Sequence, residues 1–485
     1  MSRELRRVSI VVLAMFAALF LSTSIIQVGQ SDNLRSDSRN TRTILASFSA
    51  ERGDIIVDGQ PIASSTPVDD DYQFLRQYAA GPLYAPATGY SIINGEPRGV
   101  EGALNRELAG TADSTFLAHL NQIITGQRPK GASVTLTLDA NLQQIAWDAL
   151  GDMTGAVVAL NPKTGQILAM VSKPSYDPNS LTSHNRQEAL AAYDALNADP
   201  TKPLQNRAIG GDLYAPGSTF KLITTATALE SGDYTPDSEF PNPGSLTLTG
   251  TSTTITNSEG GSCGGGATAS IATALRLSCN IPFAQLGGKL GAKAIQAQAE
   301  KFGFGDDSID IPQHVTPSQY PLYTDAAKVE QSAFGQADDR VTPLQMAMVS
   351  AGIANGGIVM KPNLVQEITA PDLSPLQEFQ STEYGRAVSE QTATTMTQMM
   401  VNGVNSGAAS NARISGVQVA GKTGTAQNGV GDPYTLWFTG FAPADDPQIA
   451  VAVVVANGGG QGQNGFGNTL AAPIAKKVME AVVKR

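Results

Sequence analysis

The pattern of hydrophobic and polar positions begins with one long apolar run. No charged residue and no proline interrupts positions 8–28, and a helix of this length spans the hydrocarbon core of a bilayer, roughly 30 Å thick. Three arginines lie within residues 1–7, and the next basic residue is Arg35. The positive-inside tendency therefore predicts a cytoplasmic tail over 1–7, a single transmembrane anchor over 8–28 and the bulk of the chain outside. A cleaved signal peptide is the alternative, but the run is long and no A-x-A-like site follows it.

Shorter patterns follow the anchor. A polar stalk, "SDNLRSDSRNTRT", leads into strand-like runs such as "GDIIVDGQPIASS" and "ASVTLTLD", with one helical stretch, "ANLQQIAWDALG". This part contains few candidate nucleophiles or bases that are grouped in a motif. We interpret residues 29–152 as a stalk and a mostly β pedestal domain.

Residues 153–485 have a different pattern of hydrophobic positions. "GAVVALNPKTGQILAMVS" is two apolar strands joined by a turn-rich segment, and "YTLWFTGFAP" and "QIAVAVVVAN" add two strands before an amphipathic terminal helix. Helical runs lie between, after Ser218 and over Ala267–Leu277, Pro343–Ala354 and Glu390–Asn402. Strands at both ends of a helical middle predict an α+β domain whose sheet is formed by its first and last segments.

Composition and charge exclude some classes of function. A chain of 485 residues has room for two or three domains, and its formal charge of -11, with no basic cluster beyond the N-terminus, argues against a nucleic-acid partner. Cys263 and Cys279 are close in sequence, and outside the cell a disulfide closing about 17 residues would stabilise by about 3 kcal/mol. Two unrelated thiols are the alternative. Zinc is not expected, because no histidine or further cysteine lies near them.

The first candidate for chemistry is "LYAPGSTFK". A Pro-Gly turn precedes Ser218, and Lys221 follows one helical turn later on the same face. A serine needs a base to become a nucleophile, and none of the three histidines lies in a glycine-rich turn or beside an orienting acid. Burial and the helix N-terminus both favour a neutral amine, so Lys221 is the nearest candidate base. An N-cap serine beside a solvated lysine is the structural alternative.

Two further polar elements occur downstream. In "LSCN", Ser278 and Asn280 end a helical run, where they can relay a proton and hold a substrate amide; a plain helix C-terminus is the alternative. In "VAGKTGTAQ", Gly424 leaves a strand position bare, so that a substrate backbone can pair with the strand edge. Lys422 and two threonines add a charge and hydroxyls there, unless this is an ordinary strand ending in a turn.

Together, Ser-x-x-Lys, Ser-x-Asn and Lys-Thr-Gly in this order resemble the signature of penicillin-binding proteins and serine β-lactamases. "NRAIGGDLYAPGSTFK", "FGQADDRVTPLQMAMVSAGIANGG" and "WFTGFAP" look like the transpeptidase domain of class B penicillin-binding proteins. "ERGDIIVDGQPIASS" and "GVEGALNRELAG" resemble its pedestal, although "RGDIIVDG" departs from the fuller Arg-Gly-x-Ile-x-Asp-Arg-Asn-Gly pattern. The similarity covers nearly the whole chain and is greatest to the short actinobacterial PbpA type.

The resemblance implies a penicillin-binding fold, with a central antiparallel sheet covered by helices, and a peptidoglycan D,D-transpeptidase activity. The substrate is then the D-alanyl-D-alanine end of a stem peptide. Ser218 would attack the penultimate carbonyl while Lys221 takes its proton, and the N–H groups of Ser218 and Thr425 would form the oxyanion hole. Acylation by penicillin and other β-lactams follows from the same chemistry.

The other motif residues receive roles from the same resemblance. Ser278 would pass a proton to the departing D-alanine, with support from Lys422. Asn280 would hold the donor peptide, and Thr423 and Thr425 would grip its terminal carboxylate beside the bare strand position. No metal or organic cofactor is implied.

Relatives of this class work beside a polytopic membrane glycosyltransferase of the shape, elongation, division and sporulation family, which is therefore an expected partner. A D,D-carboxypeptidase of the same fold and a non-catalytic penicillin-binding receptor are alternatives. A β-lactamase fits less well, because no glutamate after Ser278 begins a Glu-x-x-x-Asn pattern.

Overall fold

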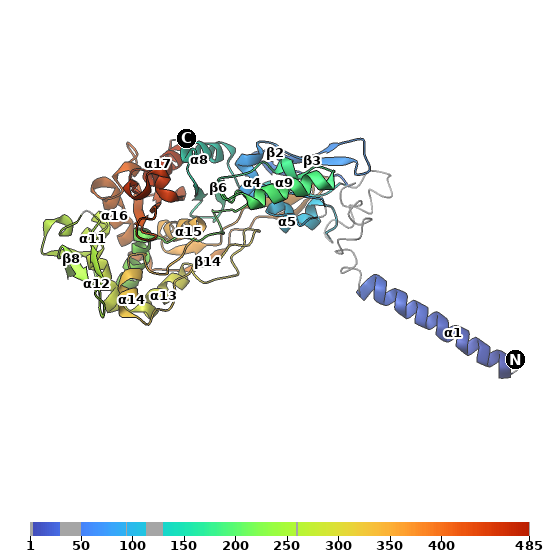
Figure 1. Ribbon diagram of the computed structural model, residues 1–485, viewed down its shortest axis with the longest axis horizontal. Helices are drawn as coiled ribbons and strands as arrows, with labels where there is room; N and C mark the ends of the chain where they lie inside the picture. Colours follow the sequence, from blue (N-terminus) through green and yellow to red (C-terminus); the bar gives the residue numbers. More distant parts are fainter. Residues whose placement is uncertain (1–2, 30–49, 94, 113–129, 259, 485) are drawn as a thin grey trace.

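The N-terminal helix is separate from the folded body of the molecule. The computed structural model describes residues 3–29, 50–93, 95–112, 130–258 and 260–484. Helix α1 (Arg3–Ser24) continues into the π-helical turn η1 (Ile25–Gly29) and carries no buried side chain. The span Arg3–Gln27 is long and apolar enough to cross a membrane, and Figure 1 shows α1 apart from the rest of the chain. Most of the predicted stalk lies outside the described residues.

The pedestal is built on a six-stranded sheet with the order β13-β12-β4-β1-β2-β3. These strands are β1 (Ile55–Val57), β2 (Gln60–Pro67), β3 (Phe74–Tyr78), β4 (Ser133–Leu136), β12 (Val365–Thr369) and β13 (Pro375–Glu378). Strand β1 runs parallel to β4, and the other pairs are antiparallel. Three short helices accompany the sheet: α4 (Gly81–Thr88), α5 (Val100–Ala103) and α6 (Asn105–Leu108).

A buried ionic cluster holds the pedestal together. The carboxylate of Glu101 is fully buried and receives Arg52 Nε at 2.5 Å and Arg76 Nε at 2.7 Å. The Tyr78 hydroxyl also donates to it, at 3.1 Å. Such pairing compensates the desolvation of a buried charge, which fixes the segment that contains α5 against strand β3.

The C-terminal part, residues 153–484, is built on a five-stranded antiparallel sheet with the order β15-β16-β17-β5-β6. The strands are β5 (Gly155–Leu160), β6 (Ile167–Lys173), β15 (Ala420–Ala426), β16 (Thr435–Ala442) and β17 (Ile449–Val455). The first and last segments of the domain therefore form one sheet, as predicted. Strand β15 lies at its edge.

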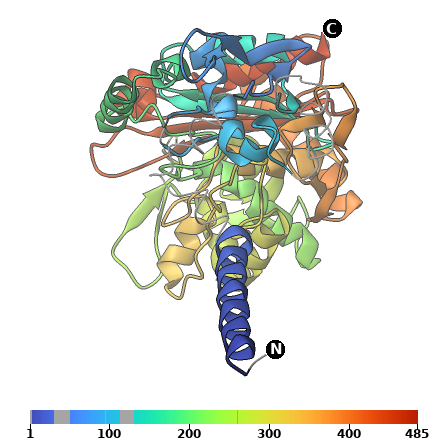
Figure 2. The same ribbon diagram turned by 90° about the vertical axis from the view of Figure 1, so that its right-hand side faces the viewer.

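Helices cover both faces of this sheet. Alternate strand residues point to opposite sides, as the pleat requires: Val157 packs in the cluster with α8 (Ala140–Leu150) and α17 (Ala471–Val483), and Val158 packs in the cluster with α15 (Pro343–Ala354). In Figure 1, α8 and α17 lie together at the top, and Figure 2 shows the folded body end-on, with α1, in blue, extending below it.

A helical lobe and several small sheets complete the fold. The remaining helices are α9 (Arg186–Ala198), α10 (Lys221–Ser231), α11 (Ile271–Leu277), α12 (Ile281–Leu290), α13 (Ala292–Lys301), α14 (Ala326–Ser332) and α16 (Glu390–Ser406). Three strand pairs are β7 (Glu239–Pro241) with β10 (Thr268–Ser270), β8 (Ser245–Thr247) with β9 (Thr254–Thr256), and β11 (Ile358–Met360) with β14 (Glu383–Arg386). Short 3₁₀ turns are η3 (Pro178–Leu181), η4 (Gly217–Phe220), η5 (Cys263–Gly265), η6 (Ser410–Ala412), η7 (Asn457–Gly460) and η8 (Gly462–Asn464).

The structure modifies two predicted elements. The predicted helix Ala267–Leu277 is wrong at its start: residues 268–270 form β10, and α11 begins at Ile271 with the Ser270 side chain accepting from Thr273 N at 3.2 Å. The predicted helix that begins at Glu390 extends beyond Asn402 to the end of α16.

The chain also crosses the predicted domain boundary at residue 152 more than once. Helix α8 precedes that boundary but packs with α17 on the five-stranded sheet, and β12 and β13 follow it but pair in the pedestal sheet. The pedestal and the C-terminal part therefore share secondary structure elements, in addition to the chain that connects them.

Candidate active site

Ser218 lies on the turn η4, which leads directly into α10. The preceding Gly217 has φ +52°, and a Cβ there would lie 3.1 Å from both Thr425 O and Ala426 N. A residue without a side chain is therefore needed for this turn to pack against β15. Gly217 N donates to Gly335 O at 2.9 Å, which anchors the turn from another side. These contacts place Ser218, which is 8% exposed, beside the sheet edge.

Lys221, at the start of α10, is fully buried. Its amine donates to Ser278 O and to Asn280 Oδ1, both at 2.8 Å. Burial, and after it the nearby charge of Lys422, hold the pKa of the Lys221 amine well below its ordinary value. The neutral amine that the sequence predicts for a base is therefore favoured by the surroundings.

Ser278 and Asn280 occupy the turn between α11 and α12. Ser278 has φ +64°, a left-handed conformation that is uncommon for a residue with a side chain. In this conformation its carbonyl faces the amine of Lys221, and its hydroxyl receives Lys422 Nζ at 2.7 Å. The structure thus brings together two lysines and the Ser-x-Asn motif from three separate parts of the chain.

Lys422 projects from the edge strand β15. Its amine donates to Ser278 Oγ at 2.7 Å and to Thr423 O at 2.9 Å. Burial lowers the pKa of Lys422 to about 7. Two lysines with lowered pKa values therefore flank Ser278, an arrangement suited to moving a proton near neutral pH.

Gly424 makes a close contact that the sequence did not predict. A Cβ there would lie 2.8 Å from Pro216 O and 3.1 Å from Trp437 Cβ. The bare position therefore admits the turn that carries Ser218. The edge position of β15 is still compatible with pairing to an extended substrate.

The two threonines of this strand make different hydrogen bonds. Thr423 Oγ1 donates to Ala408 O at 3.0 Å, whereas Thr425 Oγ1 accepts from Gly467 N at 3.2 Å. A hydroxyl that accepts one bond still has its own hydrogen to donate. Thr425, which is partly exposed, therefore retains a donor, whereas that of Thr423 is committed to the protein.

Comparison with known proteins agrees with this geometry. The penicillin binding protein transpeptidase domain matches residues 155–480, and the penicillin binding protein A dimerisation domain matches residues 52–134. The chain is 39% identical to peptidoglycan D,D-transpeptidase PbpA of Mycolicibacterium smegmatis and 40% identical to that of Mycobacterium tuberculosis H37Rv, in each case over 492 aligned residues that cover all of this chain and 99% of the relative. It belongs to the class B penicillin-binding proteins.

Solved structures extend the comparison to covalent complexes. Penicillin-binding protein A from M. tuberculosis, as a ceftriaxone acyl-enzyme complex, matches with a TM-score of 0.87 and 39% identity over 90% of this chain and 100% of that chain. Its penicillin G acyl-enzyme complex matches with a TM-score of 0.85 over the same shares. This class B penicillin-binding protein is a serine peptidoglycan D,D-transpeptidase of cell wall synthesis that binds β-lactams.

A disulfide closes the segment before Asn280 in this penicillin-binding protein. Cys263 and Cys279 are bonded, with 5.8 Å between their Cα atoms. Cys279 is the middle residue of Ser-x-Asn and is buried. The covalent link therefore attaches the Ser-x-Asn turn to η5, in the segment that precedes α11.

Sequence reasoning missed several residues that support the site. Gly335 contacts the serine turn, and Phe334 lies with its ring centre 6.0 Å from Lys221 Nζ. Trp437 Nε1 donates to Ala215 O at 2.9 Å, just before the turn. The runs "FGQADDR" and "WFTGFAP" carry all three of these residues and resemble the family, but their contacts with the turn depend on tertiary packing.

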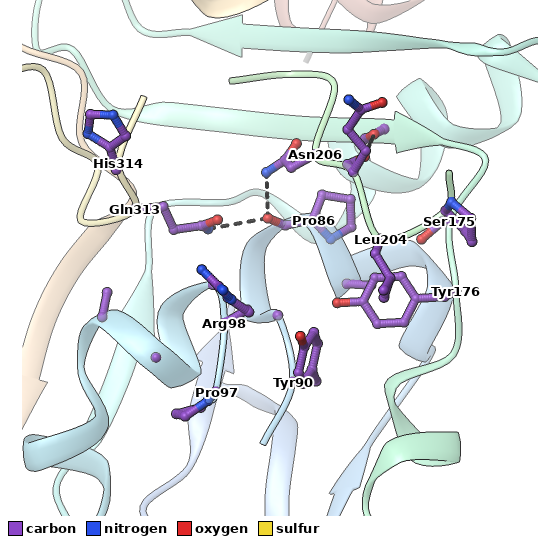
Figure 3. A pocket seen from close by; sticks show the side chains of 18 of the residues that line it. Pro86, Tyr90, Pro97, Arg98, Ser175, Tyr176, Leu204, Asn206, Gln313 and His314 are labelled. Atoms are coloured by element: carbon purple, nitrogen blue, oxygen red, sulfur yellow. Dashed lines mark hydrogen bonds between the residues drawn. The ribbon is translucent and has the colours of Figure 1, made fainter. Parts of the chain in front are cut away.

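A separate cavity of about 660 Å³ lies between the pedestal and the transpeptidase part. Figure 3 shows Tyr90 and Arg98 of the pedestal on one side and Tyr176, Asn206 and Gln313 around the rest. None of the three motifs contributes to its lining. The candidate catalytic side chains therefore lie outside this cavity.

Proposed function

We propose that Ser218 is the nucleophile of this transpeptidase and that Lys221 is its general base. The observation that carries the proposal is the buried amine of Lys221, one turn beyond Ser218, with a pKa well below the ordinary value. As Ser218 Oγ bonds to the carbonyl carbon of the penultimate D-alanine, its proton passes to Lys221. The amide C–N bond then breaks, and the proton passes from Lys221 through Ser278 to the departing nitrogen.

The second half of the reaction reverses these transfers. An amine from a neighbouring stem peptide bonds to the acyl carbon, the ester C–O bond breaks, and the proton lost by the amine returns to Ser218 Oγ. The backbone N–H groups of Ser218 and Thr425 stabilise the oxyanion in both halves, each worth about 3 kcal/mol in comparable enzymes. Packing of η4 against β15 supports this pairing of donors.

Other motif residues bind the donor peptide. Asn280 holds its amide, and Lys422 supports Ser278 in the proton relay through the 2.7 Å contact. Thr425 donates to the terminal carboxylate with the hydrogen that it retains. Thr423 can join it only by leaving Ala408 O. The absence of a side chain at Gly424 lets the serine turn reach this strand.

Labelling by a fluorescent penicillin tests these roles. The wild-type chain should form a covalent adduct, Ser218→Ala should form none, and Lys221→Ala should lose acylation while it keeps its thermal unfolding transition. Lys163→Ala is a matched control, because that lysine is exposed and pairs only with Asp446. Unlabelled wild type, or labelling of Lys221→Ala at the wild-type rate, would contradict the assignment.

A second assay separates the transpeptidase from its carboxypeptidase alternative. Lipid-linked peptidoglycan strands supply both donor and acceptor stems. Cross-linked dimers are the expected product, whereas release of D-alanine with trimmed monomers alone would favour a D,D-carboxypeptidase.

The anchor places this chemistry outside the cell in our proposal. Residues 1–7 form a cytoplasmic tail, 8–28 a single membrane span, 29–152 the stalk and pedestal, and 153–485 the transpeptidase domain. The exposed apolar helix and the arginines before it support this topology. A cysteine introduced by Ser2→Cys should react with an impermeant maleimide only after the cells are opened. Reaction in intact cells would reverse the orientation.

The anchor and pedestal are also the proposed contact surface for a polytopic membrane glycosyltransferase of the shape, elongation, division and sporulation family. Co-purification of the two proteins from membranes should require residues 1–28. Recovery that is unchanged when another protein's membrane span replaces this segment would remove the anchor from the interface.

A further inference from the structure

Two buried asparagines outside the three motifs hold the Ser-x-Asn turn. Asn257 follows strand β9, and its Oδ1 accepts from the backbone N–H groups of Asn280, at 2.9 Å, and Ile281, at 3.1 Å. These are the first donors of α12, which have no partner within the helix. Asn257, 4% exposed, thus caps α12 from a distant loop.

The cap fixes the motif asparagine at three points. Besides its backbone contact with Asn257, Asn280 donates from Nδ2 to Thr256 O at 3.0 Å and accepts Lys221 Nζ on Oδ1 at 2.8 Å. The β9 end thereby sets both the backbone and the side-chain direction of Asn280. Movement of this strand end would move an acceptor of the catalytic amine.

Asn242 in turn holds the loop that contains Asn257 through hydrogen bonds. Its Oδ1 accepts from Cys263 N at 3.1 Å and from Asn257 Nδ2 at 3.5 Å. Its Nδ2 donates to Cys263 O at 2.7 Å and to Gly266 O at 3.0 Å. Since Asn242 is 1% exposed, each of these bonds lies in a region of low dielectric, where polar networks hold one geometry.

The contacts close into a ring. Asn242 grips Cys263, the disulfide joins Cys263 to Cys279, and Asn280 returns through Asn257 to Asn242. The covalent and the hydrogen-bonded halves reach the Ser-x-Asn turn at two adjacent residues, Cys279 and Asn280. Asn242 and Asn257 both bond to backbone groups of this ring. Asn257 contacts the N–H groups of Asn280 and Ile281, which are two and three residues after Ser278.

We infer that Asn257, seated by Asn242, is a positioning residue for the transpeptidase reaction, which caps α12 so that Asn280 and Ser278 meet the amine of Lys221. The inference rests on the proposed roles of Lys221 and Asn280. Misplacement of a reacting group by about 1 Å can lower a rate about 100-fold. Asn257→Ala and Asn242→Ala should therefore each lower the rate of acylation by penicillin about 10- to 100-fold.

Matched variants of the full-length chain in detergent test this role. Gln143 is a buried amide that makes three hydrogen bonds to the backbone of Leu83 and Met170, none of them to a motif residue. Gln143→Ala should lower stability as Asn242→Ala does, yet acylate at the wild-type rate. Asn257→Asp retains the acceptor, and a carboxylate is favoured at a helix N-terminus; it should keep most of the acylation rate that Asn257→Ala loses.

A double-mutant cycle separates positioning from general destabilisation. If Asn257 acts through Asn280, the rate losses of Asn257→Ala and Asn280→Ala should combine to less than their product. A full product, an Asn257→Ala variant with the wild-type rate, or equal losses in folded Asn257→Asp and Asn257→Ala would overturn the inference. Wild-type acylation by Asn280→Ala would instead contradict the proposed function itself.

Discussion

The buried amine of Lys422 should destabilise the folded protein that it serves. Burial lowers its pKa to about 7, against an ordinary value of 10.5 in the unfolded chain. Removing a proton from such an amine at pH 7 costs about 1.36 kcal/mol for each pH unit below 10.5, or about 5 kcal/mol. Its hydrogen bonds to Ser278 Oγ and Thr423 O offset about 1 kcal/mol each. Lys422→Met should therefore raise the free energy of unfolding by about 3 kcal/mol at pH 7 or below.

The stability difference between Lys422→Met and the wild type should depend on pH in a defined direction. The unfolded chain binds the proton up to pH 10.5, whereas the folded protein releases it near pH 7, so the stability of the wild type should rise between these values. The advantage of Lys422→Met is then fully present below pH 7 and shrinks as the pH rises towards 10.5. The same variant should lose acylation by penicillin.

Thermal unfolding in detergent from pH 6 to pH 9 measures this effect, since about 3 kcal/mol corresponds to about 4 °C for a folding unit of this size. Lys163→Met removes an exposed lysine and its ion pair with Asp446, and it should change stability little. A Lys422→Met variant that unfolds below the wild type at pH 6, or whose advantage is constant up to pH 9, would refute the reasoning.

Three further predictions follow from the site. Gly424→Ala should slow penicillin acylation and lower stability by about 1–3 kcal/mol, because its Cβ would lie 2.8 Å from Pro216 O; unchanged labelling would contradict this. Trp437→Phe should lower the free energy of unfolding by about 1–3 kcal/mol, because the buried Ala215 O loses its 2.9 Å donor, and wild-type stability would count against it. Because burial lowers the pKa of Lys221, the acylation rate should rise with pH along a limb that ends well below pH 10.5. A limb at the ordinary lysine pKa would contradict a Lys221 amine that is neutral near pH 7.

Elements with strong local signals were predictable from the sequence. Helix α15 spans Pro343–Ala354 as predicted, because Thr342 accepts from Gln345 N and the proline occupies the first turn. The four apolar runs at the two ends of the transpeptidase part form adjacent strands of one sheet, as predicted. In these segments, local preference and tertiary packing favour the same structure.

Features that depend on pairing over long distances were not predictable. Strand β10 occupies the start of a predicted helix, since Thr268–Ser270 pair with Glu239–Pro241. The contact of Lys422 with Ser278 joins residues 144 positions apart, and Asn257 has no local signal that marks it as a helix cap. By resemblance, the motifs predict the candidate catalytic groups, but the residues that hold these groups in place are defined only by the fold.

The shared pedestal sheet limits how this protein can be divided. Strand β4 lies between β1 and β12, so a fragment that ends near residue 152 would expose a new sheet edge, and a fragment that begins there would carry the β12–β13 hairpin without its partner strand β4. Unpaired edges promote association with other chains. The pedestal and the transpeptidase domain should therefore be exchanged between relatives only together. A chimera joined near residue 152 should aggregate unless the β12–β13 hairpin is exchanged along with the pedestal.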